Sequence, residues 1–234
     1  MLPEKNVFKI GDGISFEDAA LMHIATFPLA AIRKCGLEIG ESALVMGLGI
    51  LGLISIPLLR LSGACPIIAV DPIKEKRDLA LSLGADYALD PYDADFALKA
   101  KKLTGGGVKV AIEVTGVGKG LDGALDCMAR FGRVALLGCT RSSDFTIDYY
   151  RKVHAPGITL VGAHTNARPA HESSDRFWTL GDDMRALICM TEYGRLSLGA
   201  LVEQTFSPTE APEVYKRLIN EKSFPITQFD WTKM

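Results

Sequence analysis

The stretch Ala43-Leu44-Val45-Met46-Gly47-Leu48-Gly49-Ile50-Leu51-Gly52, with its continuation to Val70-Asp71, decides the fold of this chain. Four apolar residues predict a buried strand, and the glycines after them predict a tight turn. The apolar run that follows Gly52 predicts a helix. A second apolar strand then ends at Asp71, 19 positions after Gly52. Strand, turn, helix, strand and acid therefore follow one another in a single unit.

The three glycines are spaced as G-x-G-x-x-G, and each has a physical role. Gly47 permits the tight turn, Gly49 lets the backbone approach a pyrophosphate, and Gly52 lets the helix pack closely against the strand. The helix N-terminus adds unpaired N–H groups and a partial positive charge. We therefore expect a dinucleotide site. The alternative is a buried strand-to-helix turn that holds no ligand.

Asp71 distinguishes the two nicotinamide cofactors. A carboxylate at this position accepts hydrogen bonds from the ribose hydroxyls of NAD and repels the 2′-phosphate of NADP. Pro72 and Ile73 come next, and neither carries a charge that would neutralise a phosphate. The sequence predicts NAD(H).

Composition narrows the class of protein. The chain has 234 residues, a hydrophobic fraction of 48%, a charged fraction of 23% and a net charge of −2. These values are ordinary for a globular protein and give no reason to expect a nucleic acid or an anionic membrane as partner. The longest apolar run, Leu51–Leu59, is too short to cross a bilayer. The N-terminus does not resemble a secretory signal.

The cysteines are odd in number, widely spread, and form no C-x-x-C pair. This usage is typical of reduced thiols, so we expect a cytoplasmic protein without structural disulfides. The five positions are Cys35, Cys65, Cys127, Cys139 and Cys189.

Short apolar segments alternate with helical ones from Ala43 onward. This alternation predicts an α/β fold, a doubly wound Rossmann-type parallel sheet of six strands with helices on both faces. The expected strands are Ala43–Met46, Ile67–Val70, Tyr87–Leu89, Val108–Val114, Val134–Leu137 and Ile158–Val161. The expected helices are Ile50–Leu61 (kinked at Pro57), Lys74–Leu83, Asp93–Leu103, Leu121–Arg130 and an additional candidate, Asp144–Val153.

The two ends of the chain have other patterns. Asn6–Ile14 suggests a short strand and turn, and Ser15 is placed to cap a helix over Ala19–Leu37, with a break or a new start at Pro28. Thr165–Thr179 is polar and predicts a loop. The remaining elements expected are a helix over Asp182–Arg195, a helix from Ser207-Pro208 to Asn220, and a strand over Ile226–Trp231.

Several motifs together resemble the medium-chain dehydrogenase/reductase superfamily. They are the glycine turn, Val70-Asp71, Leu83-Gly84-Ala85-Asp86, Glu113-Val114-Thr115-Gly116, Phe131-Gly132-Arg133-Val134, Leu137-Gly138 and Ile158-Thr159-Leu160-Val161-Gly162. Within the superfamily the chain is most similar to zinc-containing alcohol, polyol and threonine dehydrogenases. The resemblance covers nearly the whole chain.

The resemblance implies roles for individual residues. The cofactor-binding positions would be Thr26, Gly47, Gly49, Ile50, Leu51, Gly52, Asp71, Lys76, Val114, Thr115, Gly138, Ala163 and Thr165. Among them, Leu51 would press on the nicotinamide ring and Thr26 would lie beside it. Lys76 would join Asp71 at the adenosine ribose.

The chain also departs from the family pattern. The family begins with a GroES-like catalytic domain, which carries zinc ligands and has no counterpart in this sequence. We therefore expect residues 1–25 to be a remnant of that domain with a connecting helix, 26–165 to form the NAD-binding domain, and 166–234 to be the segment that would complete the catalytic domain. Catalytic residues stay unassigned, and zinc is expected only in a full-length form.

Isolated metal-binding or nucleophilic side chains have ordinary alternatives. A third zinc ligand of the family would fall at Met22 or His23, but a lone histidine is more often structural, and zinc needs three or four ligands. His164 lies where a cofactor could reach it, although a solvated loop residue is the simpler interpretation; His154 and His171 call for the same caution. Cys139 is expected to be a small buried filler.

We therefore expect the NAD(H)-binding portion of a zinc-type alcohol or polyol dehydrogenase, which moves hydride between a secondary alcohol and NAD. Two alternatives stay open: a cofactor-binding module without turnover, and a zinc-independent oxidoreductase of the quinone reductase type. The expected partners are a nicotinamide dinucleotide, a small alcohol or polyol, and a second copy of the chain.

Overall fold

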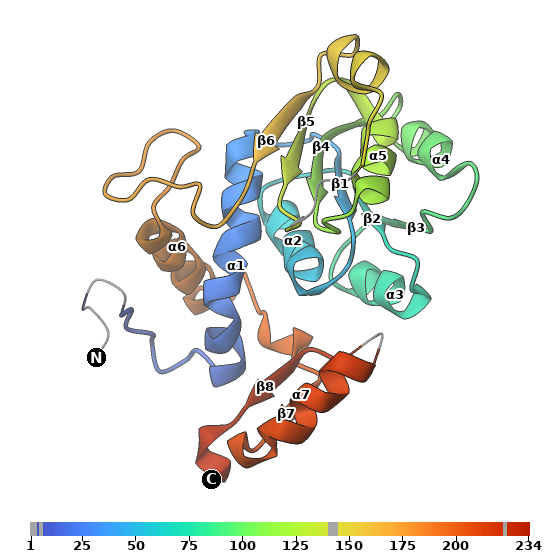
Figure 1. Ribbon diagram of the computed structural model, residues 1–234. Helices are drawn as coiled ribbons and strands as arrows, with labels where there is room; N and C mark the ends of the chain where they lie inside the picture. Colours follow the sequence, from blue (N-terminus) through green and yellow to red (C-terminus); the bar gives the residue numbers. More distant parts are fainter. Residues whose placement is uncertain (1–3, 5–6, 140–144, 222–223) are drawn as a thin grey trace.

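The computed structural model describes residues 4, 7–139, 145–221 and 224–234. Its centre is a sheet of six parallel strands in the order β3-β2-β1-β4-β5-β6 (Figure 1). The strands are β1 (Ala43–Met46), β2 (Ile67–Val70), β3 (Tyr87–Leu89), β4 (Val108–Glu113), β5 (Met128–Leu136) and β6 (Thr159–Gly162). The predicted doubly wound Rossmann fold is confirmed.

Side chains alternate between the two faces of each strand, and each face has its own helices. Ala43 and Val45 of β1 lie in one core cluster with α1 (Phe16–Cys35), α2 (Ile50–Leu61) and α3 (Lys74–Ser82). Leu44 and Met46 lie in the other, with α4 (Phe96–Leu103) and α5 (Gly118–Cys127). Both faces are thus covered, as an all-parallel sheet requires.

Helix α1 is continuous, so the predicted break at Pro28 is wrong. Ser15 caps the helix as expected, because its side chain accepts a hydrogen bond from the Asp18 N–H at 3.0 Å. Ala25 and Leu29, on either side of the proline, are buried in the same core cluster. Packing along the whole helix offsets the hydrogen bond that Pro28 cannot donate. α2 likewise continues through Pro57.

The helix expected over Leu121–Arg130 ends earlier, at Cys127, and β5 begins at Met128. Met128 pairs with Val108, after which the ladder has an irregularity before Arg133 pairs with Val110. Phe131 lies inside this irregularity with a positive φ of 61°. The sequence Met-Ala-Arg suits a helix, but the strand partner determines its conformation.

Two other expected elements are absent from the described residues. Residues 7–14 contain a turn but no strand, because Phe8, Ile10 and Ile14 pack as side chains around Met22 and α6. The helix expected over Asp144–Val153 begins at a residue outside the described part. Within 145–154 only one π-helical turn forms, Tyr150–His154. Here Phe145 and Ile147 pack against the core from a segment that belongs to no helix or strand.

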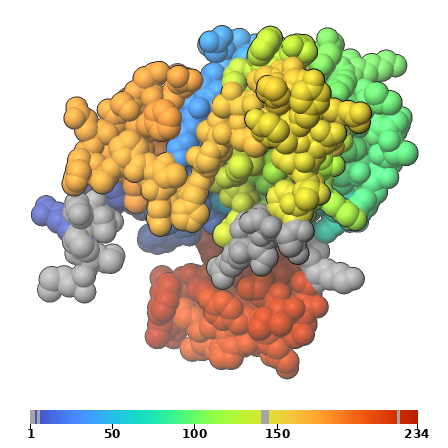
Figure 2. Space-filling view, turned by 45° about the horizontal axis from the view of Figure 1, so that its top comes forward, coloured from blue at the N-terminus to red at the C-terminus, as the bar shows by residue number. Residues whose placement is uncertain are grey.

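The C-terminal part contains α6 (Leu180–Glu192), β7 (Gln204–Phe206), α7 (Ala211–Asn220) and β8 (Thr227–Phe229). Ser207 and Glu210 form a capping box before α7, where the sequence predicts a helix start. Strands β7 and β8 pair in parallel as a separate small sheet, and residues beyond about 203 form a lobe beneath the larger body (Figure 2). Across the described residues, no helix is long and apolar enough to cross a bilayer.

Candidate functional site at the carboxyl edge of the sheet

Strand register brings most of the predicted site residues to one edge. Met46 pairs with Val70 on one side and with Glu113 on the other. Leu136 pairs with both Glu113 and Gly162. The residues that directly follow these positions include Gly47, Asp71, Val114 and Ala163. All of them therefore lie at the carboxyl edge, which is where doubly wound sheets bind ligands.

At the glycine turn, segments of the backbone approach one another closely. Gly47 has a φ of +97°, and its N–H donates to the Val70 carbonyl at 2.8 Å. A Cβ at Gly52 would overlap the Gly47 carbonyl oxygen. A Cβ at Gly49, by contrast, would meet nothing within 4 Å. Two glycines are thus needed by the fold, whereas the space in front of Gly49 is open for a ligand.

Asp71 is fixed by the turn that it faces. Its Oδ2 accepts the Leu48 N–H at 2.8 Å, and its Oδ1 accepts the Ile73 N–H at 2.9 Å. Only 7% of the residue is exposed. The backbone behind it is held as well, since Arg77 Nη1 donates to the Asp71 carbonyl at 2.7 Å. The carboxylate is therefore oriented before any ligand arrives.

A hollow of about 380 Å³ opens beside Asp71. Its walls come from the ends of β1 and β2, the turn after β4, and the start of α5. The lining includes Gly47, Asp71, Pro72, Tyr92, Phe96, Thr115 and Val117. The walls are largely apolar and carry two charged residues, Asp71 and Lys119. Such a hollow suits a nucleoside, whose base is flat and whose ribose donates hydrogen bonds.

Lys76 lies elsewhere. It lines a smaller hollow of about 140 Å³, together with Gly49, Ile50 and the C-terminal residues Phe224–Ile226. Lys76 and Asp71 therefore line different hollows. The N-terminus of α2, where Gly49 caps the helix and Ile50 begins it, lines the same hollow as Lys76.

The turn after β4 is held by Glu113. Its Oε1 accepts the Thr115 N–H at 2.7 Å, the Gly116 N–H at 3.3 Å, and the Thr115 hydroxyl. Burial raises the pKa of Glu113 above its usual value, while these hydrogen bonds act in the opposite direction. Glu113 thus fixes Val114 and Thr115, two of the cofactor-binding positions that the family resemblance implies.

On the other half of the edge, Gly138 and Ala163 follow β5 and β6. A Cβ at Gly138 would overlap the Gly116 N–H, so a glycine is required where these two loops meet. Ala163 is buried, and its N–H donates to the Leu136 carbonyl at 3.2 Å. Thr26 is fully buried in α1, and its hydroxyl donates to the His23 carbonyl at 2.7 Å. The Thr26 side chain is thus buried and hydrogen-bonded within its own helix.

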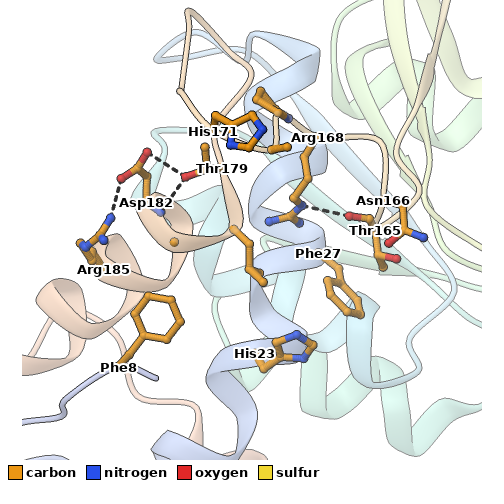
Figure 3. Close-up of a pocket in the computed structure, with 14 residues that line it drawn as sticks. Phe8, His23, Phe27, Thr165, Asn166, Arg168, His171, Thr179, Asp182 and Arg185 are labelled. Atoms are coloured by element: carbon orange, nitrogen blue, oxygen red, sulfur yellow. Dashed lines mark hydrogen bonds and ion pairs between the residues drawn. The ribbon is translucent and has the colours of Figure 1, made fainter. Parts of the chain in front are cut away.

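A second, larger hollow of about 600 Å³ lies between α1, the loop after β6 and the start of α6 (Figure 3). His23 and Phe27 contribute from α1, with their rings 5.4 Å apart at the centroids. Thr165 and His171 contribute from the loop, and Asp182 from α6, where it pairs with Arg185 at 2.8 Å. Its lining is rich in polar groups, in contrast to the hollow beside Asp71.

Sequence reasoning missed the charged residues that hold this loop. Asp183 is fully buried and contacts Arg33 at 2.9 Å and Arg168 at 3.4 Å. Lys34, 8% exposed, donates to the carbonyls of Gly162 and Ala167. Arg168 lies in a stretch that reads as a polar loop, and Asp183 lies in what reads as an ordinary acidic first helical turn. No local pattern connects them, because Arg33 and Asp183 are 150 positions apart.

The described residues do not fit a zinc site. Nowhere in them do three His, Cys, Asp or Glu side chains gather in a way that could hold a metal ion. Met22 is 1% exposed and packs with Ile14, Met184 and Ile188, so it is a core residue. Of the two positions where the family resemblance places a third zinc ligand, His23 is the one that is exposed.

The other isolated side chains lie as follows. His164 is exposed, and its Nδ1 accepts the Asn166 N–H at 3.1 Å. His154 contacts the rings of Tyr149 and Tyr150. Cys139 is exposed, so the expectation that it fills a buried space is wrong. It follows Gly138 at the carboxyl edge, where the chain leaves the sheet.

Comparison with known proteins agrees with this geometry. Residues 51–179 match the zinc-binding dehydrogenase family. The chain belongs to this family. The match spans the α2 helix, strands β2 to β6 and the loop that follows them, so it includes most of the carboxyl edge.

Individual relatives extend the likeness along the chain. D-guloside 3-dehydrogenase of Escherichia coli (strain K12) is 26% identical over 214 residues, which are 91% of this chain and 61% of that protein. The chain thus spans about three-fifths of that relative's length.

Two solved structures share the fold. One is an alcohol dehydrogenase from E. coli CFT073 complexed with NADH, with a TM-score of 0.82 and 16% identity, covering 98% of this chain and 64% of that one. The other is a zinc-binding dehydrogenase from Sinorhizobium meliloti 1021 bound to NADP, with a TM-score of 0.77 and 23% identity, covering 91% and 59%. Proteins of this fold are thus found with either cofactor.

Proposed function

We propose that this zinc-binding dehydrogenase binds NAD(H) along the carboxyl edge of its sheet, as the cofactor-binding part of an alcohol or polyol dehydrogenase. One observation carries the proposal: Asp71 directly follows β2 as a buried carboxylate, oriented by two backbone N–H groups beside an open glycine turn. A ribose diol satisfies such a carboxylate, whereas a 2′-phosphate meets like charge.

Different residues of the chain would bind different parts of the cofactor. The hollow beside Asp71, bounded by Thr115, would take the adenosine, and the N-terminus of α2 behind Gly49 would take the pyrophosphate. Ile50 and Leu51 are the first residues of that helix, and Lys76 lines the same hollow as Ile50. Gly138, Ala163, Thr165 and the Thr26 backbone would surround the nicotinamide. Bound NAD supplies the hydride acceptor, and the chain's own groups bind and orient it.

The substrate side is the polar hollow between α1 and the loop after β6. Its histidines and hydroxyl groups suit a hydroxylated substrate, which supports an alcohol or polyol. A zinc ion would need ligands beyond the described residues, and no catalytic step is assigned to it. A domain division at residues 25/26 and 165/166 is part of this proposal, although α1 runs across the first boundary.

Cofactor choice is tested by titrating the protein with NADH and NADPH and following protein-to-cofactor fluorescence energy transfer. We expect NADH to bind at least about tenfold more tightly, which corresponds to about 1.4 kcal/mol. Asp71→Ala should narrow this preference. Equal or tighter binding of NADPH by the wild-type protein would contradict the proposal. Turnover with a panel of secondary alcohols, with and without added zinc, separates a complete enzyme from a binding module.

We further propose that the chain pairs with a second copy along β6, an edge strand of the sheet. Three of its four residues are exposed, including Leu160. Light scattering at increasing concentration tests this, and a monomer at high concentration would contradict it. A cytoplasmic location, favoured by the cysteine pattern, is tested by fractionation.

A further inference from the structure

Arg168 uses all three guanidinium nitrogens to hold parts of the chain that are distant in sequence. Its Nε donates to the Thr165 carbonyl at 3.0 Å, and its Nη2 donates to the Thr26 carbonyl at 3.2 Å. Its Nη1 lies 3.4 Å from Asp183 Oδ2. The loop after β6, helix α1 and helix α6 therefore meet at one planar group (Figure 3 shows the Thr165 contact).

The surroundings make this contact rigid. The Arg168 side chain is 9% exposed and that of Asp183 is not exposed at all. Asp183 is also bound by Arg33, whose guanidinium carbon lies 3.6 Å from the centroid of the Trp178 ring. Buried charge pairs of this kind are strongly destabilising to break, so the arginine has little freedom to leave.

We call the three contacts of the Arg168 guanidinium the clamp. Its position in the fold indicates its role. Gly162 ends β6, so the loop 163–168 begins at the carboxyl edge of the β4–β6 half. In doubly wound sheets a dinucleotide crosses from one mononucleotide half to the other along this edge. Because Asp71 and the glycine turn belong to the first half, the second half receives the nicotinamide. Arg168 binds backbone from both walls of that end.

We propose that Arg168, with Asp183, is a positioning residue that sets the loop after β6 and the Thr26 turn of α1 in the shape that receives the nicotinamide half of NAD. This inference rests on the proposed NAD site. Without Arg168, Lys34 would still hold the carbonyls of Gly162 and Ala167, but the backbone at Thr165 and Thr26 would have to be ordered on binding. That entropic cost would fall on the nicotinamide half of the ligand alone. The adenosine half has its own supports in Asp71 and Glu113.

ADP-ribose distinguishes the two halves, since it lacks only the nicotinamide. Affinities for NAD and for ADP-ribose are measured by calorimetry on the wild-type protein and on Arg168→Met. We expect the variant to bind ADP-ribose like the wild type and NAD about tenfold more weakly. Asp183 keeps Arg33 in this variant. Arg168→Lys, which keeps a charge beside Asp183 but cannot reach both carbonyls, should give a smaller loss in the same direction.

Arg133→Met is the matched control. Arg133 is also a clamp, donating to the carbonyls of Cys35 and Gly36 and pairing with Glu41. It pairs with Val110 next to Ala43, the first residue of β1, and so lies toward the opposite edge of the sheet. Its loss should leave the ratio of NAD affinity to ADP-ribose affinity unchanged, even where stability falls.

The outcomes separate the two proposals. If the wild-type protein binds neither ligand, the NAD site itself is wrong and the inference falls with it. If it binds both, and both Arg168 variants keep the wild-type ratio or lose the two ligands equally, the site stands and Arg168 is not a nicotinamide positioner. A change in ratio as large for Arg133→Met as for Arg168→Met would equally overturn the inference.

Discussion

The two halves of the carboxyl edge are held by different kinds of interaction. Around the glycine turn, the hydrogen bonds run between backbone groups or between Asp71 and the N–H groups of Leu48 and Ile73, which belong to the same strand–helix–strand segment. At the loop after β6, long charged side chains reach across the molecule to backbone carbonyls and to Asp183. The first half is specified by local sequence, and the second by tertiary structure. The two halves should therefore respond differently to substitution.

The largest expected effect comes from removing the shared anion of the second half. Asp183→Asn would leave Arg33 and Arg168 without their buried counter-charge, at a cost of about 3–5 kcal/mol in the free energy of unfolding. Urea denaturation measures it. A loss below about 1 kcal/mol, the range of surface ion pairs, would mean that solvent reaches the cluster.

The corresponding change in the first half is Gly52→Ala. The new Cβ would overlap the Gly47 carbonyl oxygen, which is backbone and cannot move aside, so we expect a loss of about 2–3 kcal/mol by overpacking. Thermal or urea unfolding checks the stability, and NADH titration should show weakened binding. Unchanged stability would show that the turn tolerates a wider approach of α2 to β1.

Gly49→Ala sharpens the comparison because it separates fold from ligand. The added Cβ meets nothing within 4 Å and the residue has an ordinary φ of −72°, so stability should be unaffected. If a pyrophosphate approaches this backbone, NADH affinity should fall about tenfold, or about 1.4 kcal/mol. Wild-type affinity in this variant would contradict the placement of the pyrophosphate.

The smallest effect concerns the Arg133–Glu41 pair, whose side chains are 23% and 20% exposed. Burial acts to raise the pKa of Glu41, but hydrogen bonds from Arg133 and the Glu38 N–H outweigh it and lower the pKa. A lowered carboxyl pKa stabilises the fold above the unfolded value of about 4.3, and this contribution is lost as the pH falls through the folded pKa.

Glu41→Gln should therefore cost about 1 kcal/mol near pH 7, and the gap to the wild type should close in acid. Unfolding curves at several pH values between 7 and 3 would check it. A gap that stays constant or widens on acidification would show that the Glu41 carboxylate is not stabilised by Arg133.

The comparison also explains what the sequence could predict. The six strands and the glycine turn were predictable because apolar runs and glycine spacing are local signals, and the position of Asp71 follows from them. The course of α1 through Pro28 was not, because packing on both sides of the proline decides it. The start of β5 at Met128 depends on its pairing with Val108, 20 positions earlier.

The candidate site divides in the same way. Residues at strand ends, such as Asp71, Val114 and Ala163, lie together because register places them so. Arg168, Lys34 and Asp183 gave no signal, since a buried arginine in a polar loop has the same letters around it as a solvated one. The sequence likewise did not predict that Lys76 and Asp71 line different hollows.

The self-contained glycine turn has a consequence for how such proteins can be recombined. The hydrogen bonds that orient the Asp71 carboxylate come from the N–H groups of Leu48 and Ile73, inside one strand–helix–strand segment. That segment can be exchanged between homologous genes and carry its cofactor preference with it. The loop after β6 cannot travel alone, because its anchors at Thr26, Lys34 and Asp183 lie in two other segments that would have to move along with it.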